Sequence, residues 1–201
     1  RGNSNCILGR LLWKLSEKMP VGLVSVDGGL ADNAIPRQTK AVVVVEEKDA
    51  ESLEQQVAAL AAELADELAT KDPDVKVTAK RLADTAETIT CAAPEETKRV
   101  AAFLQATPNG VQAMSADMPG LVQTSLNLGI LKADAESLRA EYSVRSSVES
   151  EKDNLIAKLS ALVELTGGDY VVTGDYPGWK YRVHSPLREK MVKLYAEMYG
   201  N

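Results

Sequence analysis

Hydrophobic and polar residues alternate over two neighbouring segments, and this alternation is the clearest pattern in the chain. In segment 122–130, apolar side chains and Thr124 occupy every second position, and segment 138–145 repeats the period of two. This period is typical of strands that bury one face and expose the other, so the two segments predict an antiparallel hairpin. Arg145 falls on the polar face of the second strand.

Five other segments are predicted to be helices. Four carry hydrophobic residues three or four positions apart, the spacing of an amphipathic helix, and the fifth begins with a proline, which is favoured in a first helical turn. They lie near residues 4–18, 49–70, 94–104, 150–166 and 186–199. The second of these could be a partner-binding coiled coil, but it holds only about three heptads, so a core-facing helix is the favoured interpretation.

Four further strands are predicted near residues 21–26, 41–45, 75–80 and 170–173. The β-branched run at 41–45 suits a strand that is covered on both faces. Because strands and helices interleave with a hairpin among them, the pattern predicts an α+β fold, a mostly antiparallel sheet with helices packed on one face. The order helix–strand–strand–helix–strand occurs near residues 4–80 and again near 95–173, which indicates ferredoxin-like units.

Composition narrows the possible partners and compartments. The net charge is −6 and no window is rich in basic residues, so a nucleic-acid partner is not expected. The apolar runs are too short or too interrupted to span a membrane. Cys6 and Cys91 form no CxxC motif, and unpaired thiols of a cytoplasmic protein are the favoured interpretation. The chain opens on Arg1 and ends as a helix finishes, so both ends are expected to be processing boundaries rather than natural termini.

Residues that could break a bond are scarce. His184 is the only histidine, and a loop histidine is favoured over a catalytic one. Zinc sites need several His, Cys or carboxylate ligands at short spacings, and the sequence holds no such cluster. It also lacks GxSxG, HExxH and Gly-rich phosphate-loop motifs. The sequence therefore predicts no catalytic residue and no metal ligand within this chain.

Asn33 and Arg145 could still hold a small anion. Asn33 lies in the turn-like segment 28–37, and a side-chain amide and a guanidinium are suitable donors to a carboxylate. Each residue has an ordinary alternative, in which the Asn33 amide bonds the local backbone of a turn and Arg145 is a solvated surface charge. On the residues alone, the ordinary interpretations are favoured.

Five motifs follow one another along the chain in an order that resembles one enzyme family. They are Gly28-Gly29 with Asn33-Ala34-Ile35-Pro36-Arg37, Ala106-Thr107-Pro108-Asn109-Gly110-Val111, Thr124-Ser125-Leu126-Asn127-Leu128-Gly129, Val144-Arg145-Ser146-Ser147 and Tyr176-Pro177-Gly178-Trp179. Together they resemble bacterial aminoacyl-histidine dipeptidases, also called Xaa-His dipeptidases or the peptidase D type, which belong to the carnosinase-like di-zinc peptidase superfamily. The resemblance runs over nearly the whole chain.

The resemblance implies that this chain is part of a larger enzyme. Such enzymes bind two zinc ions in a catalytic domain, into which a lid, or dimerisation, domain is inserted, and the chain resembles the lid. Residues 1–178 would form the lid, with 47–136 as an insertion within it, and 179–201 would start the return into the catalytic domain. The family's zinc ligands, its glutamate general base and its His-Ser-Gly-Gly segment lie outside this chain, so the chain alone is expected to be inactive.

The same resemblance assigns a role to Asn33 and Arg145, which would bind the C-terminal carboxylate or the backbone of a dipeptide. With the resemblance included, this role is favoured over a plain turn and a surface charge. The whole protein would be a cytoplasmic zinc metallodipeptidase acting on Xaa-His-type dipeptides, a homodimer through its lid, without nucleic-acid or membrane partners. Two alternatives stay open: a non-catalytic ferredoxin-like binding or assembly module, and the lid of a related tripeptidase, carboxypeptidase or deacylase.

Overall fold

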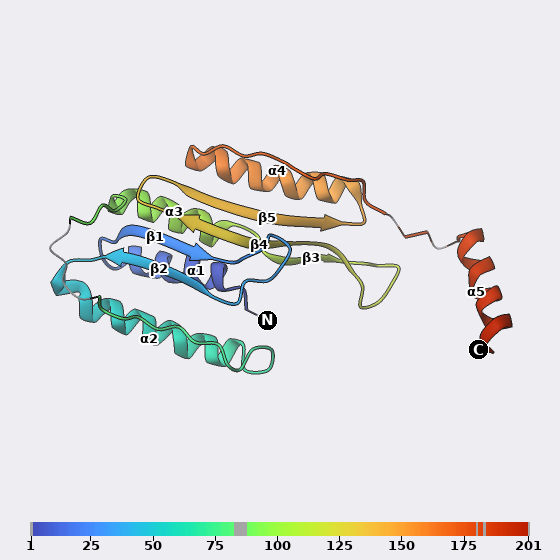
Figure 1. Ribbon diagram of the computed structural model, residues 1–201, viewed down its shortest axis with the longest axis horizontal. Helices are drawn as coiled ribbons and strands as arrows, with labels where there is room; N and C mark the ends of the chain where they lie inside the picture. The colour runs from blue at the N-terminus through green and yellow to red at the C-terminus, as the bar shows by residue number, and fades with distance from the viewer. Residues whose placement is uncertain (1, 83–87, 180, 183, 201) are drawn as a thin grey trace.

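A five-stranded antiparallel sheet organises the chain, and helices pack around it (Figure 1). The computed structural model describes residues 2–82, 88–179, 181–182 and 184–200. The strands are β1 (Gly22–Gly28), β2 (Thr39–Val44), β3 (Gly110–Met114), β4 (Val122–Ala133) and β5 (Leu138–Ser146). The helices are α1 (Ser4–Ser16), the short 3-10 helix η1 (Glu47–Asp49), α2 (Ala50–Glu67), α3 (Pro94–Ala106), α4 (Glu149–Thr166) and α5 (Pro186–Tyr199). The predicted α+β class with an antiparallel sheet is confirmed.

Strand β4 is the centre of the sheet. Its partner β5 pairs with residues 124–133 and so occupies the whole of one edge, which confirms the predicted hairpin. Since a strand has only two edges, β3 and β1 must share the other one. There β3 pairs with residues 122–126 and β1 with residues 131–133, both antiparallel. Residues 127–130 therefore have no strand partner on that edge among the residues that the structure describes.

A bulge in β4 changes the face that its side chains occupy. The pairing with β5 shifts register between Leu128 and Ile130. Before the bulge Leu128 points into the core, and after it Leu131 takes that place instead of Ile130; both leucines are 0% exposed. Strict alternation predicted Leu128 and Ile130 on one face, and the bulge explains the difference, because one extra residue inverts every later side chain.

The core lies between the sheet and the helices α1, α3 and α4. Its buried cluster consists of Leu12, Leu23, Val26, Ala101, Phe103, Leu104, Leu128 and Leu131. Helix α4 adds Leu162 and Val163 at the margin of this cluster. Helix α2 runs beside α1 and buries Val57, Leu60 and Leu64, so its predicted core-facing character is confirmed (Figure 1).

Helix α1 starts where its sequence predicts. Asn3 is the N-cap, and its side-chain oxygen accepts hydrogen bonds from the backbone N–H groups of Asn5 and Cys6, at 2.9 and 3.2 Å. Such a cap satisfies donors that the first turn leaves without partners. This cap matters for the site, because the same asparagine also reaches the central strand.

Three predictions about strands were wrong, and one strand was missed. Segments 75–80 and 170–173 form no strand, so the helix–strand–strand–helix–strand order is not repeated in two units. Strand β3 forms although it was not predicted. Strand β2 was expected to be covered on both faces, but none of its residues is buried and Val44 is 39% exposed. A β-branched segment becomes a strand only where a partner strand can satisfy its backbone groups, and the sequence pattern does not reveal the partner.

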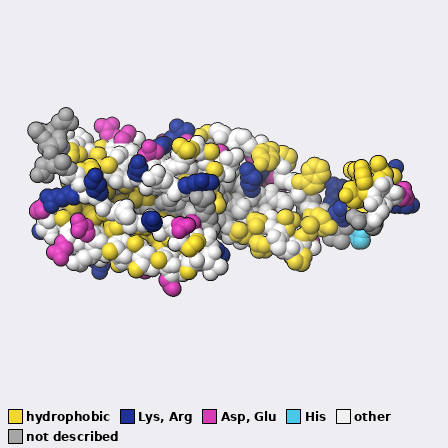
Figure 2. Space-filling view, turned by 60° about the horizontal axis from the view of Figure 1, so that its bottom comes forward, with side chains coloured by type: hydrophobic (Ala, Val, Ile, Leu, Met, Phe, Trp, Pro, Cys, Tyr) yellow, Lys and Arg dark blue, Asp and Glu magenta, His cyan; other side chains and the backbone are white. Residues whose placement is uncertain are grey.

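Helix α5 lies apart from the sheet (Figure 1). It has no buried residue, and its apolar side chains are exposed: Leu187, Met191, Val192, Leu194, Tyr195, Met198 and Tyr199. The hairpin of β3 and β4 also carries exposed apolar side chains, and Figure 2 shows hydrophobic side chains gathered at this end of the molecule. Every helix in the described ranges is too short or too polar to cross a membrane. The domain boundaries proposed from the sequence stay a prediction.

Candidate functional site

Asn33 lies in the loop that joins β1 to β2. The loop opens at Gly29, whose φ of 78° is in the left-handed region that favours glycine. The Asn33 side chain is exposed and makes no hydrogen bond to any residue that the structure describes. The ordinary interpretation, in which this amide bonds the local backbone, is therefore not what the structure shows.

A neighbouring side chain holds the loop instead. The amide nitrogen of Asn127 on β4 donates to the carbonyl oxygens of Asp32 and Ala34, at 2.9 and 2.8 Å. These two carbonyls lie directly before and after Asn33 in the chain. Further along the loop, the hydroxyl of Ser4 donates to the carbonyl oxygen of Pro36 at 3.1 Å. The backbone is thus fixed on both sides of Asn33 while its side chain stays available.

A cluster of asparagines fills the unpaired edge of β4. The amide nitrogen of Asn3 donates to the carbonyl oxygen of Leu128 at 3.0 Å and to the side-chain oxygen of Asn127 at 3.1 Å. Asn5, which is fully buried, donates to the same carbonyl at 3.2 Å. On the other side, the side-chain oxygen of Asn109 accepts from the backbone N–H of Leu128 at 2.9 Å. Side-chain amides therefore replace the ladder bonds that a strand would have made.

Arg145 lies on the same face of the sheet as Asn127. It pairs with Ser125, while Asn127 pairs with Ser143. Residues two apart on a strand share a face, and diagonal neighbours are about 7–8 Å apart. The Arg145 side chain is exposed and forms no ion pair or hydrogen bond within the described ranges. The structure thus brings the strand of Arg145 next to the residue that holds the Asn33 loop, and it records no direct contact between Asn33 and Arg145.

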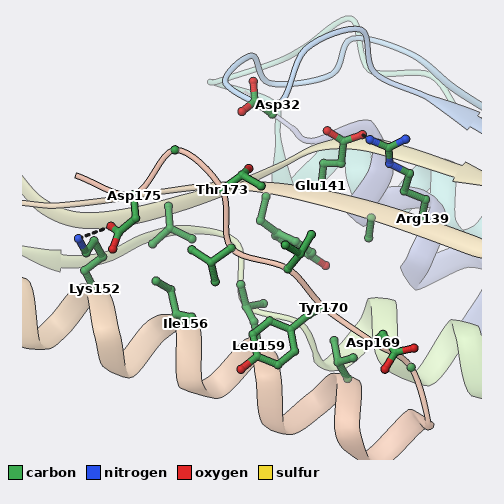
Figure 3. A pocket seen from close by; sticks show the side chains of 18 of the residues that line it. Asp32, Arg139, Glu141, Lys152, Ile156, Leu159, Asp169, Tyr170, Thr173 and Asp175 are labelled. Carbon is green, nitrogen blue, oxygen red and sulfur yellow. Dashed lines mark hydrogen bonds and ion pairs between the residues drawn. The ribbon is translucent and has the colours of Figure 1, made fainter. Parts of the chain in front are cut away.

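An open cavity of about 1160 Å³ borders this region. Asp32, the neighbour of Asn33, lines it together with Ser125 and Arg145. Residues 168–179, which we call the strap, pass between β5 and α4 along its opposite side, where Ile156 and Leu159 face them (Figure 3). The loop, the polar face of β5 and the strap therefore all line the same cavity.

The other cations that line the cavity have acidic partners. Arg139 pairs with Glu141 at 2.9 Å. Lys152 is buried, and its ammonium group bonds Asp175 of the strap at 2.6 Å and Glu149 of α4 at 2.7 Å. The hydrogen bond to Asp175, followed by that to Glu149, raises the pKa of Lys152. The hydrogen bond from Lys152 lowers the pKa of Glu149. These groups tie the strap to α4, and Arg145 is the cation left available among those named here.

The described residues include no cluster of metal-binding side chains. No group of three or more His, Cys, Asp or Glu side chains in the described ranges is placed to hold a metal ion. Burial raises the pKa of the Cys6 thiol to about 11, so it stays protonated and weakly nucleophilic at neutral pH. We therefore assign no step through a metal to these residues.

Sequence reasoning selected Asn33 and Arg145 and did not single out Asn127 and its cluster. Asn127 sits at a polar position of an alternating strand, which predicts a solvent-facing side chain. Asn3 lies just before the segment predicted as the first helix, and Asn109 lies in one of the five motifs, directly before a glycine. The signal that could have found them is the number of asparagines flanking predicted element ends, since their amides can replace backbone partners.

Comparison with known proteins identifies relatives over the whole chain, although no family model matches it. The sequence is 29% identical over 199 residues, 99% of the chain, to the cytosol non-specific dipeptidase of Escherichia coli (strain K12), of which it covers 40%. The structure is similar to the crystal structure of aminoacylhistidine dipeptidase from Vibrio alginolyticus, with a TM-score of 0.89 and 29% identity. That similarity covers 100% of this chain and 40% of the crystallised one, so the chain spans about two fifths of the length of these relatives. The chain is therefore homologous to the peptidase D-type cytosol non-specific dipeptidase and, in structure, to aminoacylhistidine dipeptidase.

Proposed function

We propose that this chain is the substrate-binding lid and dimerisation domain of a longer metallodipeptidase that hydrolyses Xaa-His-type dipeptides. The observation that carries the proposal is that the whole chain matches a dipeptidase structure at a TM-score of 0.89 while covering only 40% of it. The remaining polypeptide would bind two zinc ions and supply the catalytic residues, so the present chain alone would not hydrolyse peptides. We also propose that the whole protein is cytoplasmic, as the name of its Escherichia coli relative indicates.

Asn33 and Arg145 would bind the C-terminal carboxylate of the dipeptide. Both side chains are exposed and have no partner within the described residues, so neither must break a bond before it takes a ligand. A charge-assisted hydrogen bond of this kind contributes about 1.5–3 kcal/mol. A carboxylate held at a fixed distance from the scissile bond also selects substrate length, because a longer peptide places its carboxylate elsewhere.

Exposed apolar side chains of α5 and of the β3–β4 hairpin support contacts with the remaining polypeptide. Helix α5 has an exposed apolar side, and apolar side chains of the β3–β4 hairpin gather near the same end of the molecule (Figure 2). Exposed patches of this kind are typical of interaction sites. We assign this end to contact with the remaining polypeptide. Strand β2 ends the sheet, and its outer edge pairs with no other strand in the described part of the chain. We assign the homodimer contact to the lid, where such an edge can pair.

The test uses the full-length protein and the variant Arg145→Ala. We expect kcat/KM for a dipeptide such as Ala-His to fall roughly 10- to 150-fold, since the charge-assisted contact is lost. Arg139→Ala is the matched control, because Arg139 lies on the same strand and face but is already paired with Glu141. Thermal denaturation of both variants checks that folding is preserved. Unchanged kinetics in Arg145→Ala would remove the role assigned to this residue.

Substrate class is tested separately. Full-length protein is assayed against β-alanyl-histidine, other dipeptides, tripeptides and N-acyl amino acids under the same conditions. Preference for the dipeptides supports the proposal, and preference for N-acyl amino acids or tripeptides would support the lid of a related deacylase or tripeptidase. Hydrolysis of any of these by the isolated 201-residue chain would contradict the assignment of catalysis to the remaining polypeptide.

A further inference from the structure

We infer that Asn127 is a positioning residue for substrate recognition, because its side-chain amide fixes the loop that presents Asn33. The inference rests on the proposed function of Asn33 as a carboxylate-binding residue. Asn127 itself would not touch the substrate. It would act by keeping Asn33 in the backbone conformation from which its amide reaches the carboxylate.

The hydrogen bonds of Asn127 bracket Asn33. One amide nitrogen donates both to the carbonyl oxygen of Asp32 at 2.9 Å and to that of Ala34 at 2.8 Å. The first carbonyl belongs to the peptide group that precedes Asn33, and the second to the residue that follows it. With both fixed, rotation about the backbone of Asn33 is restricted, while no contact in the described structure holds its side chain. This arrangement orients a residue for an outside ligand.

Asn127 is itself held in place from the opposite side. Its side-chain oxygen accepts a hydrogen bond from the amide of Asn3 at 3.1 Å. Asn3 is 7% exposed and is fixed by its capping bonds to the first turn of α1. Because both ends of the Asn127 amide are occupied, its donors point at the loop in one orientation only. Hydrogen bonds through Asn127 and Asn3 therefore fix the position of the loop relative to β4 and to the start of α1.

Gly129 allows the loop to lie this close. A Cβ atom built at this position would overlap the backbone of Asp32, so only glycine permits the observed approach. The loop thus meets β4 at two points, by backbone contact at Gly129 and by hydrogen bonds at Asn127. The backbone contact alone does not bracket Asn33. Removal of the Asn127 amide is therefore expected to loosen residues 32–34 and leave the strand intact.

The position of Asn127 also relates the two proposed donors to each other. Arg145 is a diagonal neighbour of Asn127 on the same face of the sheet. Two donors can bind one carboxylate only when both lie within hydrogen-bonding distance of its oxygens. By fixing the loop against the strand pair that carries Arg145, Asn127 sets the spacing between the amide and the guanidinium.

The experiment compares a dipeptide with its C-terminal amide in the full-length protein. The readout is the ratio of kcat/KM for Ala-His to kcat/KM for Ala-His amide, which reports recognition of the free carboxylate and is insensitive to the amount of folded enzyme. The variants are Asn33→Ala, Asn127→Ala and the double variant. Asn109→Ala is the matched control, because Asn109 accepts from Leu128 and, at 3.4 Å, from Asn3, but makes no hydrogen bond to the loop among the described residues.

We expect Asn33→Ala to lower the acid-to-amide ratio about tenfold or more, and Asn127→Ala to lower it by a similar or smaller factor. The double variant should lose no more than Asn33→Ala alone, because Asn127 acts only through Asn33. Asn109→Ala should lower thermal stability and leave the ratio unchanged. Asn127→Thr, which suits a strand and keeps one donor, should retain an intermediate ratio and provides a folded variant if Asn127→Ala is unstable.

The outcomes separate the two proposals. An unchanged ratio in Asn33→Ala overturns the role of Asn33 and the inference with it. A reduced ratio in Asn33→Ala with an unchanged ratio in Asn127→Ala and Asn127→Thr overturns only the inference. Losses that multiply in the double variant would show that Asn127 acts independently of Asn33, and equal losses for acid and amide would show a purely structural role. Either result also overturns the inference.

Discussion

The hydroxyl of Thr97 on α3 provides the sharpest test of how the strand leading to the Asn33 loop is held. Strand β1 pairs with β4 only at residues 26–28, so its earlier residues have no strand on that side. There the backbone N–H of Leu23 donates to the hydroxyl oxygen of Thr97 at 3.0 Å, and the carbonyl of Leu23 accepts from Ala92 at 2.7 Å. Thr97 is 0% exposed and Leu23 is 1% exposed, so water cannot replace this bond.

Two substitutions of Thr97 separate the hydrogen bond from the packing. Thr97→Val keeps the shape but leaves the Leu23 N–H buried without a partner, which costs about 1–3 kcal/mol. Thr97→Ser keeps the hydroxyl and loses one methyl group, which costs about 0.8 kcal/mol. We therefore expect Thr97→Val to be the less stable of the two. Because 1 kcal/mol corresponds to roughly 2–4 °C in a chain of this size, Thr97→Val should lower Tm by roughly 2–12 °C.

The assay is equilibrium urea denaturation of the 201-residue chain, followed by tryptophan fluorescence. Of its two tryptophans, Trp13 packs against the core and Trp179 is 90% exposed. A Trp179→Phe background therefore makes Trp13 the reporter of core unfolding and serves as the parent for both variants. Equal denaturant slopes would show that only stability has changed. If Thr97→Val proved as stable as Thr97→Ser, the hydrogen bond would not hold β1 as argued.

Three further predictions concern the strap, the α1–α2 contact and the approach of the loop. Lys152→Met should speed chymotrypsin cleavage within residues 168–178 several-fold, because the strap loses the bonds of Asp175 and Tyr176 to Lys152. Lys158→Met on the exposed side of α4 should not. The hydrogen bond from Lys14 of α1 lowers the pKa of Glu63 in the folded protein. The ionised carboxylate therefore stabilises the fold at pH values above the pKa of the unfolded chain. This stabilisation is lost as the pH falls through the lower pKa of the folded protein. Glu63→Gln should therefore have a lower Tm than the parent at pH 7, and this difference should shrink as the pH falls through the lowered pKa of Glu63. Gly129→Ala should lower Tm by several degrees in a thermal scan, because the added methyl group overlaps the loop backbone.

The sequence predicted those elements whose signals are local. The β4–β5 hairpin follows from alternation, and the start of α1 from the capping preference of Asn3. Strand β3 has a weak local pattern and exists because the edge of β4 is available to it. Conversely, segment 75–80 has suitable residues and finds no partner. Strand formation in these cases depends on tertiary pairing, which a single sequence does not display.

The candidate site also combines residues that the sequence could indicate with one that depends on tertiary contacts. Asn33 and Arg145 were selected because an amide and a guanidinium suit a carboxylate, and the structure places both on exposed surface beside one central strand. The role inferred for Asn127 could not be predicted, because it depends on two carbonyl groups from a loop 93 to 95 residues earlier in the chain. Polar residues on strands are usually solvated, so sequence pattern favours the wrong interpretation for it.

The gap in the edge of β4 connects the fold to the proposed site. Had β1 or β3 extended across residues 127–130, the backbone groups of Leu128 would have bonded a strand, and the loop could not have reached Gly129. Because both strands stop short, asparagine side chains satisfy Leu128, and the amide of Asn127 remains directed at the loop. The interruption therefore removes ladder hydrogen bonds from β4, and it allows the loop to bind at a fixed position on this central strand. A site that binds a small anion between a loop and a strand needs the loop in a fixed position, because a flexible loop does not hold its donors at the distances that one carboxylate requires.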